Sequence, residues 1–70
     1  MTIHNFDFGN SSMLSNCSYD DITQELTVTF TNGRSYTYEA VSINTYQDLT
    51  NAASAGKYFN QIKNNLKAKT

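Results

Sequence analysis

The segment 26–38 (LTVTFTNGRSYTY) constrains the fold of this chain more than any other stretch. Apolar residues alternate with threonines up to Phe30, which is the pattern of a strand with one buried face. The Asn32-Gly33 pair that follows tolerates the positive φ angles of a tight turn. The sequence therefore predicts an antiparallel hairpin, and its second strand carries Tyr36 and Tyr38 on one face.

Another strand is predicted before this hairpin. Residues 9–12 are typical of a loop, and residues 13–19 read as a short core strand. Asp20 and Asp21 then predict a turn, because aspartate side chains accept hydrogen bonds from nearby backbone N–H groups.

Two helices are predicted after the hairpin. Ser42 is a favourable N-cap for a first helix over residues 43–51. The small residues 52–56 interrupt the pattern. A second helix follows, in which Phe59, Ile62 and Leu66 have helical spacing.

These elements together predict an α+β fold: a three-stranded antiparallel β-meander followed by two helices packed on one face of the sheet. Residues 1–10 form an N-terminal arm or an extra strand, in which His4, Phe6 and Phe8 share one side. Residues 11–70 form a single domain.

The length of 70 residues allows only a small core, so the folded state is expected to be marginally stable by itself. Cys17 is the single cysteine and cannot form an intrachain disulfide, so we expect a small buried side chain. Because a disulfide is excluded, self-association is the other common way for so short a chain to gain stability, and we expect it. The N-terminal segment has no signal-peptide pattern, and no stretch is apolar enough to span a membrane, which predicts a cytoplasmic protein.

The net charge of −1 does not favour general affinity for nucleic acids. All acidic residues precede residue 50, and four of the five cationic side chains follow it. The C-terminal helix is therefore expected to be basic, either as a solvated face or as a stripe that contacts phosphates. Its lysines are Lys57, Lys63, Lys67 and Lys69.

In the order and spacing of these motifs, the chain resembles the KTSC domain, a short domain found alone in bacterial and phage proteins and at the C-terminus of some lysyl-tRNA synthetases. Ser42 departs from the family, which usually has proline there, but both residues start helices well. The resemblance runs from Ser11 to Lys63, about three quarters of the chain. Its residues are Ser11, Ser12, Tyr19, Asp20, Leu26, Val28, Phe30, Asn32, Gly33, Tyr36, Thr37, Tyr38, Val41, Tyr46, Leu49, Ser54, Ala55, Gly56, Tyr58, Phe59, Asn60, Ile62 and Lys63.

The resemblance implies a non-catalytic module of unsettled function, for which RNA binding has been suggested from the synthetase context. The residues have to be weighed separately, because a fold does not imply a function.

The segment from Ser54 to Lys57 is the main candidate site. It opens the second helix, whose N-terminal N–H groups and partial positive charge suit an anion. Ser54, Gly56 and Lys57 would complete a phosphate site, and Arg34 would strengthen it if the hairpin tip lies near. The alternative is structural: Ser54 caps the helix, and Gly56 permits close packing against the sheet.

Further candidate ligand-binding residues surround this segment. Tyr36 and Tyr38 are either core residues or stacking platforms for bases, and Tyr58 belongs to one of these classes. Asn60 and Lys63 lie on the second helix, where they would contact a base, a sugar or a phosphate.

Catalysis is not expected. His4 is the only histidine, it lacks a partner at catalytic spacing, and no nucleophile has an evident base. No metal or cofactor is indicated.

Three functions remain open. The first is a small oligomer that binds a phosphate-bearing nucleotide, as in phage proteins that sequester nucleotide immune signals. The second is a single-stranded RNA-binding module. The third is a protein-interaction module that uses the apolar residues Phe6, Phe8 and Met13.

Overall fold

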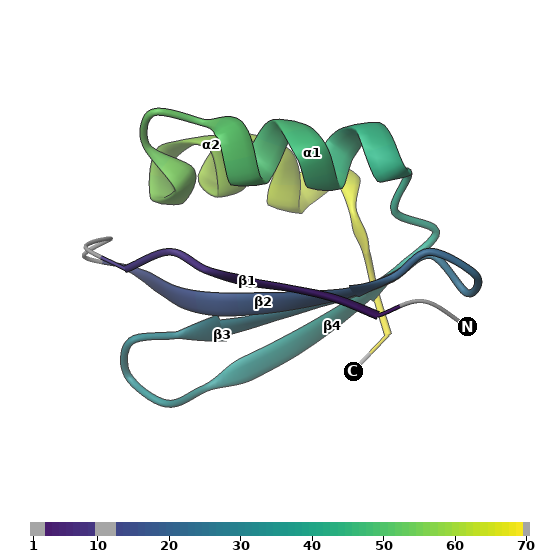
Figure 1. Ribbon diagram of the computed structural model, residues 1–70, viewed down its shortest axis with the longest axis horizontal. Helices are drawn as coiled ribbons and strands as arrows, with labels where there is room; N and C mark the ends of the chain where they lie inside the picture. The colour runs from purple at the N-terminus through teal and green to yellow at the C-terminus, as the bar shows by residue number, and fades with distance from the viewer. Residues whose placement is uncertain (1–2, 10–12, 70) are drawn as a thin grey trace.

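The computed structural model describes residues 3–9 and 13–69. They form two layers, an antiparallel sheet and a pair of helices that covers one of its faces (Figure 1). The five strands lie side by side in the order β1-β2-β3-β4-β5, which is their order in the chain. Most of the predicted loop 9–12 lies outside the described residues.

The elements begin with the strands β1 (Ile3–Asp7), β2 (Leu14–Asp20), β3 (Glu25–Phe30) and β4 (Ser35–Glu39). The helices α1 (Ile43–Asn51) and α2 (Ala55–Ile62), the 3-10 turn η1 (Lys63–Asn65) and the short strand β5 (Lys67–Ala68) follow.

The predicted hairpin is confirmed as β3 and β4, which pair in antiparallel register. Its turn needs a positive φ only at Gly33, where φ is +90°. The Gly33 N–H donates to the Phe30 carbonyl at 3.0 Å, and the Arg34 N–H donates to the Asn32 side chain at 3.0 Å. Asn32 therefore supports the turn through its side-chain oxygen.

The strand β2 contains an irregularity that its sequence pattern does not reveal. Leu14 and Cys17 are three residues apart, so a regular strand would point them to opposite faces. A register shift between Leu14 and Asn16 absorbs the extra residue, and both Leu14 and Cys17 are buried. The β-bulge thus keeps both apolar side chains on the helix side.

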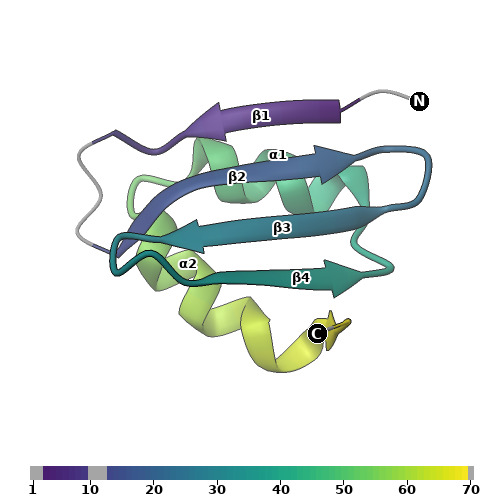
Figure 2. The ribbon, with the colours of Figure 1, turned by 90° about the horizontal axis from the view of Figure 1, so that it is seen from below.

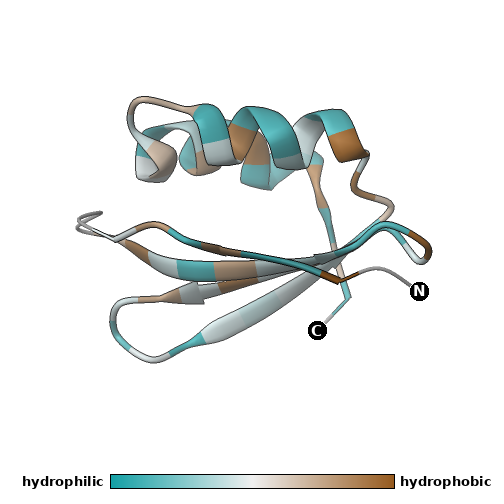
Figure 3. Ribbon diagram, viewed as in Figure 1, coloured by the Kyte–Doolittle hydropathy of each residue, from teal (hydrophilic) through white to brown (hydrophobic). Residues whose placement is uncertain are grey.

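The first helix matches its prediction. The Ser42 hydroxyl accepts the Thr45 N–H at 3.2 Å, which satisfies one of the N–H groups that the first turn leaves unpaired. Tyr46 and Leu49 are the buried residues of this helix. In Figure 3 both helices mix hydrophobic and hydrophilic residues along their length, as helices on a sheet do.

The predicted number of strands, three with a possible fourth at the N-terminus, was too low, because the sheet has a fifth strand after the helices. The predicted second helix was also too long, since α2 ends at Ile62 and Leu66 follows η1 in extended conformation. Chain extension from Leu66 brings Lys67 opposite Glu39 and Ala68 opposite Tyr38. The end of the predicted second helix is therefore a short strand that pairs with β4.

The core lies between the sheet and the helices. Leu26 and Val28 of β3 are fully buried beneath Leu49 of α1 and Phe59 of α2, all within one cluster. Cys17 belongs to the same cluster, as the prediction of a buried thiol required. Burial raises the pKa of the Cys17 thiol to about 11.

The other sheet face is polar, and Figure 2 shows it with the helices behind the strands. Hydroxyl groups pair across β3 and β4: Thr27 with Thr37 and Thr29 with Ser35, each at 3.0 Å. This face supplies hydrogen-bonding groups in place of the aromatic platform that base stacking requires.

The described part of the chain contains no helix with the length and apolar character of a membrane span.

Candidate functional site

A groove of about 730 Å³ lies where the end of β1 faces the loop between α1 and α2. Its volume is in the range of pockets that hold small ligands. The groove has an apolar wall from the N-terminal part of the chain and a polar wall from the start of α2. The lining residues used below are Phe6, Asp7, Phe8, Met13, Ser54, Gly56, Lys57 and Asn60.

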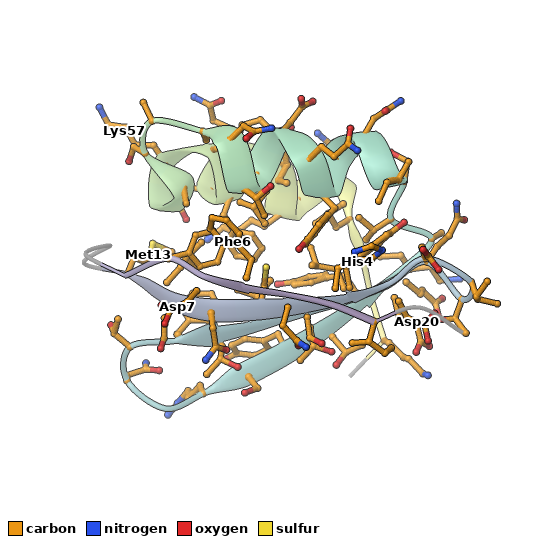
Figure 4. The ribbon with its side chains drawn as sticks, in the orientation of Figure 1. His4, Phe6, Asp7, Met13, Asp20 and Lys57 are labelled. Carbon is orange, nitrogen blue, oxygen red and sulfur yellow. The ribbon has the colours of Figure 1, made fainter. Side chains whose placement is uncertain are left out.

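The apolar wall exists because β1 alternates. Phe6 pairs with Cys17 of β2 in the sheet register, so both face the helix layer. Figure 4 shows Phe6 directed toward the helices. The Phe6 and Phe8 rings meet edge to face with centroids 5.1 Å apart. Phe6 stays 36% exposed, so an aromatic surface faces the groove.

The polar wall is the first turn of α2. Its first helical hydrogen bond runs from the Tyr58 N–H to the Ser54 carbonyl at 3.0 Å. The N–H groups of residues 55–57 therefore come before the first acceptor that the helix itself provides. Ser54 occupies the N-cap position, but its side chain makes no capping bond. The predicted alternative, in which the Ser54 hydroxyl caps the helix, is therefore not seen.

Gly56 joins the two walls. A Cβ at this position would lie 3.3 Å from the Met13 Cβ, closer than most real contacts. The close-packing role expected of Gly56 is thus present, and it leaves the first turn of α2 against the residue that precedes β2.

Charged and polar groups lie at the rim. Figure 4 shows Lys57 extending away from the sheet and Asp7 on the side of the sheet opposite Phe6. Asp7 accepts the Gly9 N–H at 2.8 Å, which engages one of its oxygens. The Asn60 amide lies 3.8 Å from the Met13 sulfur.

The structure brings together only some of the predicted ligand-binding residues. Ser54, Gly56, Lys57 and Asn60 line the groove, whereas Arg34 in the hairpin turn does not.

The two tyrosines of β4 lie on the covered sheet face, opposite Val28 and Leu26. Tyr38 packs edge to face on Phe59 with centroids 5.7 Å apart, while Tyr36 packs on Phe30 at 5.6 Å and is 38% exposed. Their first contacts are therefore with the core.

Tyr58 and Lys63 also lie outside the groove lining. Tyr58 is half-buried against the core, and its pKa is raised by burial and by the negative charge of the nearby Asp48 carboxylate. Lys63 lies at the opposite end of α2, as its C-cap.

The prediction of one basic helical stripe was wrong for two of its lysines. Lys67 is in β5 and lies 3.2 Å from Glu39, and Lys69 forms an ion pair with Glu25. The Glu25 hydrogen bond and charge raise the pKa of Lys69. These lysines thus pair with acids on the polar sheet face.

His4 belongs to a separate cluster at the other end of β1. Its Nε2 lies 3.0 Å from an Asp21 carboxylate oxygen, and its ring lies 6.0 Å from that of Tyr46. The cluster ties β1 to the turn after β2. In the described residues, acids, histidines and cysteines form no group of three that would hold a metal.

The site prediction missed eight residues that line the groove: Phe6, Asp7, Phe8, Met13, Thr50, Ala52, Ala53 and Ala55. Phe6, Phe8 and Met13 were recognised only as an apolar patch, because the sequence does not show that β1 pairs with β2 beside the start of α2. The alternation of His4, Phe6 and Phe8 was the available signal.

Comparison with known proteins identifies a family and solved structures with a similar fold. The KTSC domain model matches residues 10–65. An uncharacterized protein of Stutzerimonas stutzeri (strain A1501) is 44% identical over 52 residues, which cover 74% of this chain and 73% of that protein.

The crystal structure of a KTSC domain protein from Yersinia pestis superimposes with a TM-score of 0.87, covering 99% of this chain and 97% of that one. Its sequence identity is 23%, so the likeness concerns the fold. With the family model matching most of its length, this chain belongs to the KTSC domain family.

Proposed function

We propose that this protein is a non-catalytic, homo-oligomeric binder of a phosphate-bearing nucleotide, held in the groove between β1 and α2. The observation that carries the proposal is the exposed ring of Phe6, which packs edge to face on Phe8 and lines the groove together with the first turn of α2. A nucleotide matches the two walls of the groove, because it has a flat aromatic base at one end and a phosphate at the other.

The phosphate is assigned to the first turn of α2. Backbone N–H groups at the start of a helix suit an anion, and the positive end of the helix dipole adds to the attraction. The exposed Lys57 ammonium at the rim supplies a positive charge, and the Ser54 hydroxyl, which does not cap the helix, is available as a donor.

The base is assigned to the aromatic wall. Stacking on an aromatic ring contributes about 1–3 kcal/mol per base. The Asn60 amide, which contacts the Met13 sulfur, would offer hydrogen bonds to the base or the sugar.

A single nucleotide fits these features better than a long RNA strand. The chain has a net charge of −1, and two of the lysines outside the groove pair with glutamates, so a continuous path for a phosphate backbone is not favoured. Sequestration of a nucleotide immune signal in a bacterial cytoplasm is the role that such a small binder would serve. RNA binding and protein interaction are the competing roles.

Isothermal titration calorimetry with AMP and with a cyclic dinucleotide, 3′,3′-cyclic di-AMP, tests the proposal. Phe6→Ala and Lys57→Ala should each weaken binding about ten-fold or more, which corresponds to about 1.4 kcal/mol. Lys63→Ala, at the far end of α2, is the matched control and should bind like the original chain. Equal loss in the Lys63 and Lys57 variants would refute the groove as the site.

A further inference from the structure

The outer edge of β1 has the features of an interface between two copies of this chain. β1 is the first strand of the sheet, and among the described residues only β2 pairs with it. Its five residues keep a continuous register with β2 from Ile3 to Asp7, so the strand is regular over its whole length. A regular open strand is a template for another strand.

The two edges of the sheet differ in their protection. The opposite edge, β5, has two residues, and lysines lie at and beside it, which are the usual devices against edge pairing. β1 contains neither lysine nor proline, and its side chains Ile3 and Phe6 are 47% and 36% exposed. The contrast indicates that the β1 edge is built for contact.

The backbone direction of β1 can be read from one hydrogen bond. The Phe8 N–H donates to the Ser15 carbonyl of the neighbouring chain segment at 3.0 Å. Because inward and outward groups alternate in an antiparallel pair, His4 and Phe6 also direct their backbone groups toward β2. The N–H and C=O groups of Ile3, Asn5 and Asp7 therefore point outward.

We propose that two copies pair through β1, antiparallel, around a two-fold axis at Asn5. The outward backbone groups of Asn5 would then meet those of Asn5 in the second copy. Ile3 of each copy would meet Asp7 of the other, which gives two further residue pairs. Each of these three residue pairs exchanges two hydrogen bonds, about six in total. An isologous contact of this kind closes after two copies and gives a continuous ten-stranded sheet.

Self-complementarity selects this register. Centring on Asn5 overlaps all five residues and sets each Asp7 against an isoleucine. Moving the axis by one residue, to His4 or to Phe6, shortens the overlap from five residues to three, and moving it on to Asp7 sets two aspartates directly opposite each other. Like charges directly opposite one another are destabilising, so charge and overlap favour the same axis.

The pairing would extend the groove. Phe6 lines the groove, and in this register it lies opposite His4 of the second copy. The second copy would therefore cover the exposed edge of Phe6 and form an outer boundary beside the aromatic wall. The pairing itself does not depend on the proposed nucleotide function, since it uses the strand edge alone.

Sedimentation velocity of the full chain over a concentration series tests the proposal. The original chain should sediment as a dimer at high concentration. Ile3→Glu sets a glutamate against Asp7 of the second copy, twice per dimer, and should raise the dimer dissociation constant about ten-fold or more. The double variant Ile3→Glu/Asp7→Lys changes the repulsion to attraction and should restore the dimer.

Ile22→Glu is the control, because Ile22 is also an exposed isoleucine but lies in the β2–β3 turn and not in the β1 strand. It should dimerise like the original chain, and circular dichroism should show all variants folded. A chain that is monomeric throughout, a dimer indifferent to Ile3→Glu, or a double variant that stays monomeric would overturn the proposal. Since Ile3 does not line the groove, loss of dimer with intact ligand binding separates the two proposals.

Discussion

Gly56 in the first turn of α2 lies directly against Met13, with 3.3 Å from the position of a Gly56 Cβ to the Met13 Cβ. The contact holds the start of a helix against the entrance of a strand 43 positions earlier in the chain. It therefore sets the width of the groove at the point where the phosphate is proposed to bind.

Enlarging Gly56 should separate these elements. Gly56→Val adds a branched side chain where even one carbon is crowded, and overpacking of this kind costs about 1–3 kcal/mol. Ala53→Val, in the exposed loop before α2, should change the free energy of unfolding by about 0.5 kcal/mol or less. Urea denaturation of both variants measures the difference, and equal stability of the two would contradict the contact.

The two tyrosines of β4 should differ in their contribution to stability. Tyr38 is half-buried and packs on the buried Phe59, so Tyr38→Ala should cost about 2–3 kcal/mol. Tyr36 is more exposed, and Tyr36→Ala should cost about 1 kcal/mol. Thermal unfolding of the two variants compares their stabilities. A larger loss of stability in Tyr36→Ala than in Tyr38→Ala would contradict the prediction.

The His4–Asp21 pair should contribute a small, measurable coupling between β1 and the β2–β3 turn. Both side chains are about a third exposed, and pairs of this kind contribute about 0.5 kcal/mol. A double-mutant cycle of His4→Ala and Asp21→Ala, followed by urea denaturation, isolates that coupling. Strictly additive losses would mean that the 3.0 Å contact carries no net stabilisation.

Stability should fall in alkali partly because of Cys17. Its pKa in the folded protein is about 11, above the ordinary value of 9.0, so the unfolded chain loses the thiol proton first. The contribution is complete below pH 9 and is lost as the pH rises through about 11. Tyrosines with raised pKa titrate in the same range, so the comparison must be with Cys17→Ala. The Cys17→Ala variant should lose less stability than the original chain between pH 8 and pH 11, and identical pH profiles would contradict this account.

Local patterns predicted the elements whose side chains and turns are determined within a few residues. The β3–β4 hairpin, the Ser42 cap and the Asp20 turn are of this kind, and the Asp20 side chain indeed accepts the Ile22 N–H at 2.9 Å. Each depends on contacts close in sequence.

The missed features depend on distant partners. β5 forms because Lys67 and Ala68 find β4 some 28 residues earlier, and helical spacing at Leu66 gave no sign of that pairing. The bulge in β2 responds to core packing across the sheet.

The candidate site divides in the same way. The first turn of α2 could be predicted because glycine, serine and lysine adjoin in sequence. The aromatic wall could not, because Phe6 reaches α2 only through its pairing with Cys17 in β2.

Native mass spectrometry of protein purified gently from bacterial lysate tests the central claim most directly, followed by denaturation of the same sample and identification of what is released. The account predicts a folded oligomer that carries a nucleotide-sized, phosphate-containing mass, lost in the Phe6→Ala and Lys57→Ala variants and retained in Lys63→Ala. A folded protein that carries no such mass and gains none when incubated with 3′,3′-cyclic di-AMP or AMP would contradict it.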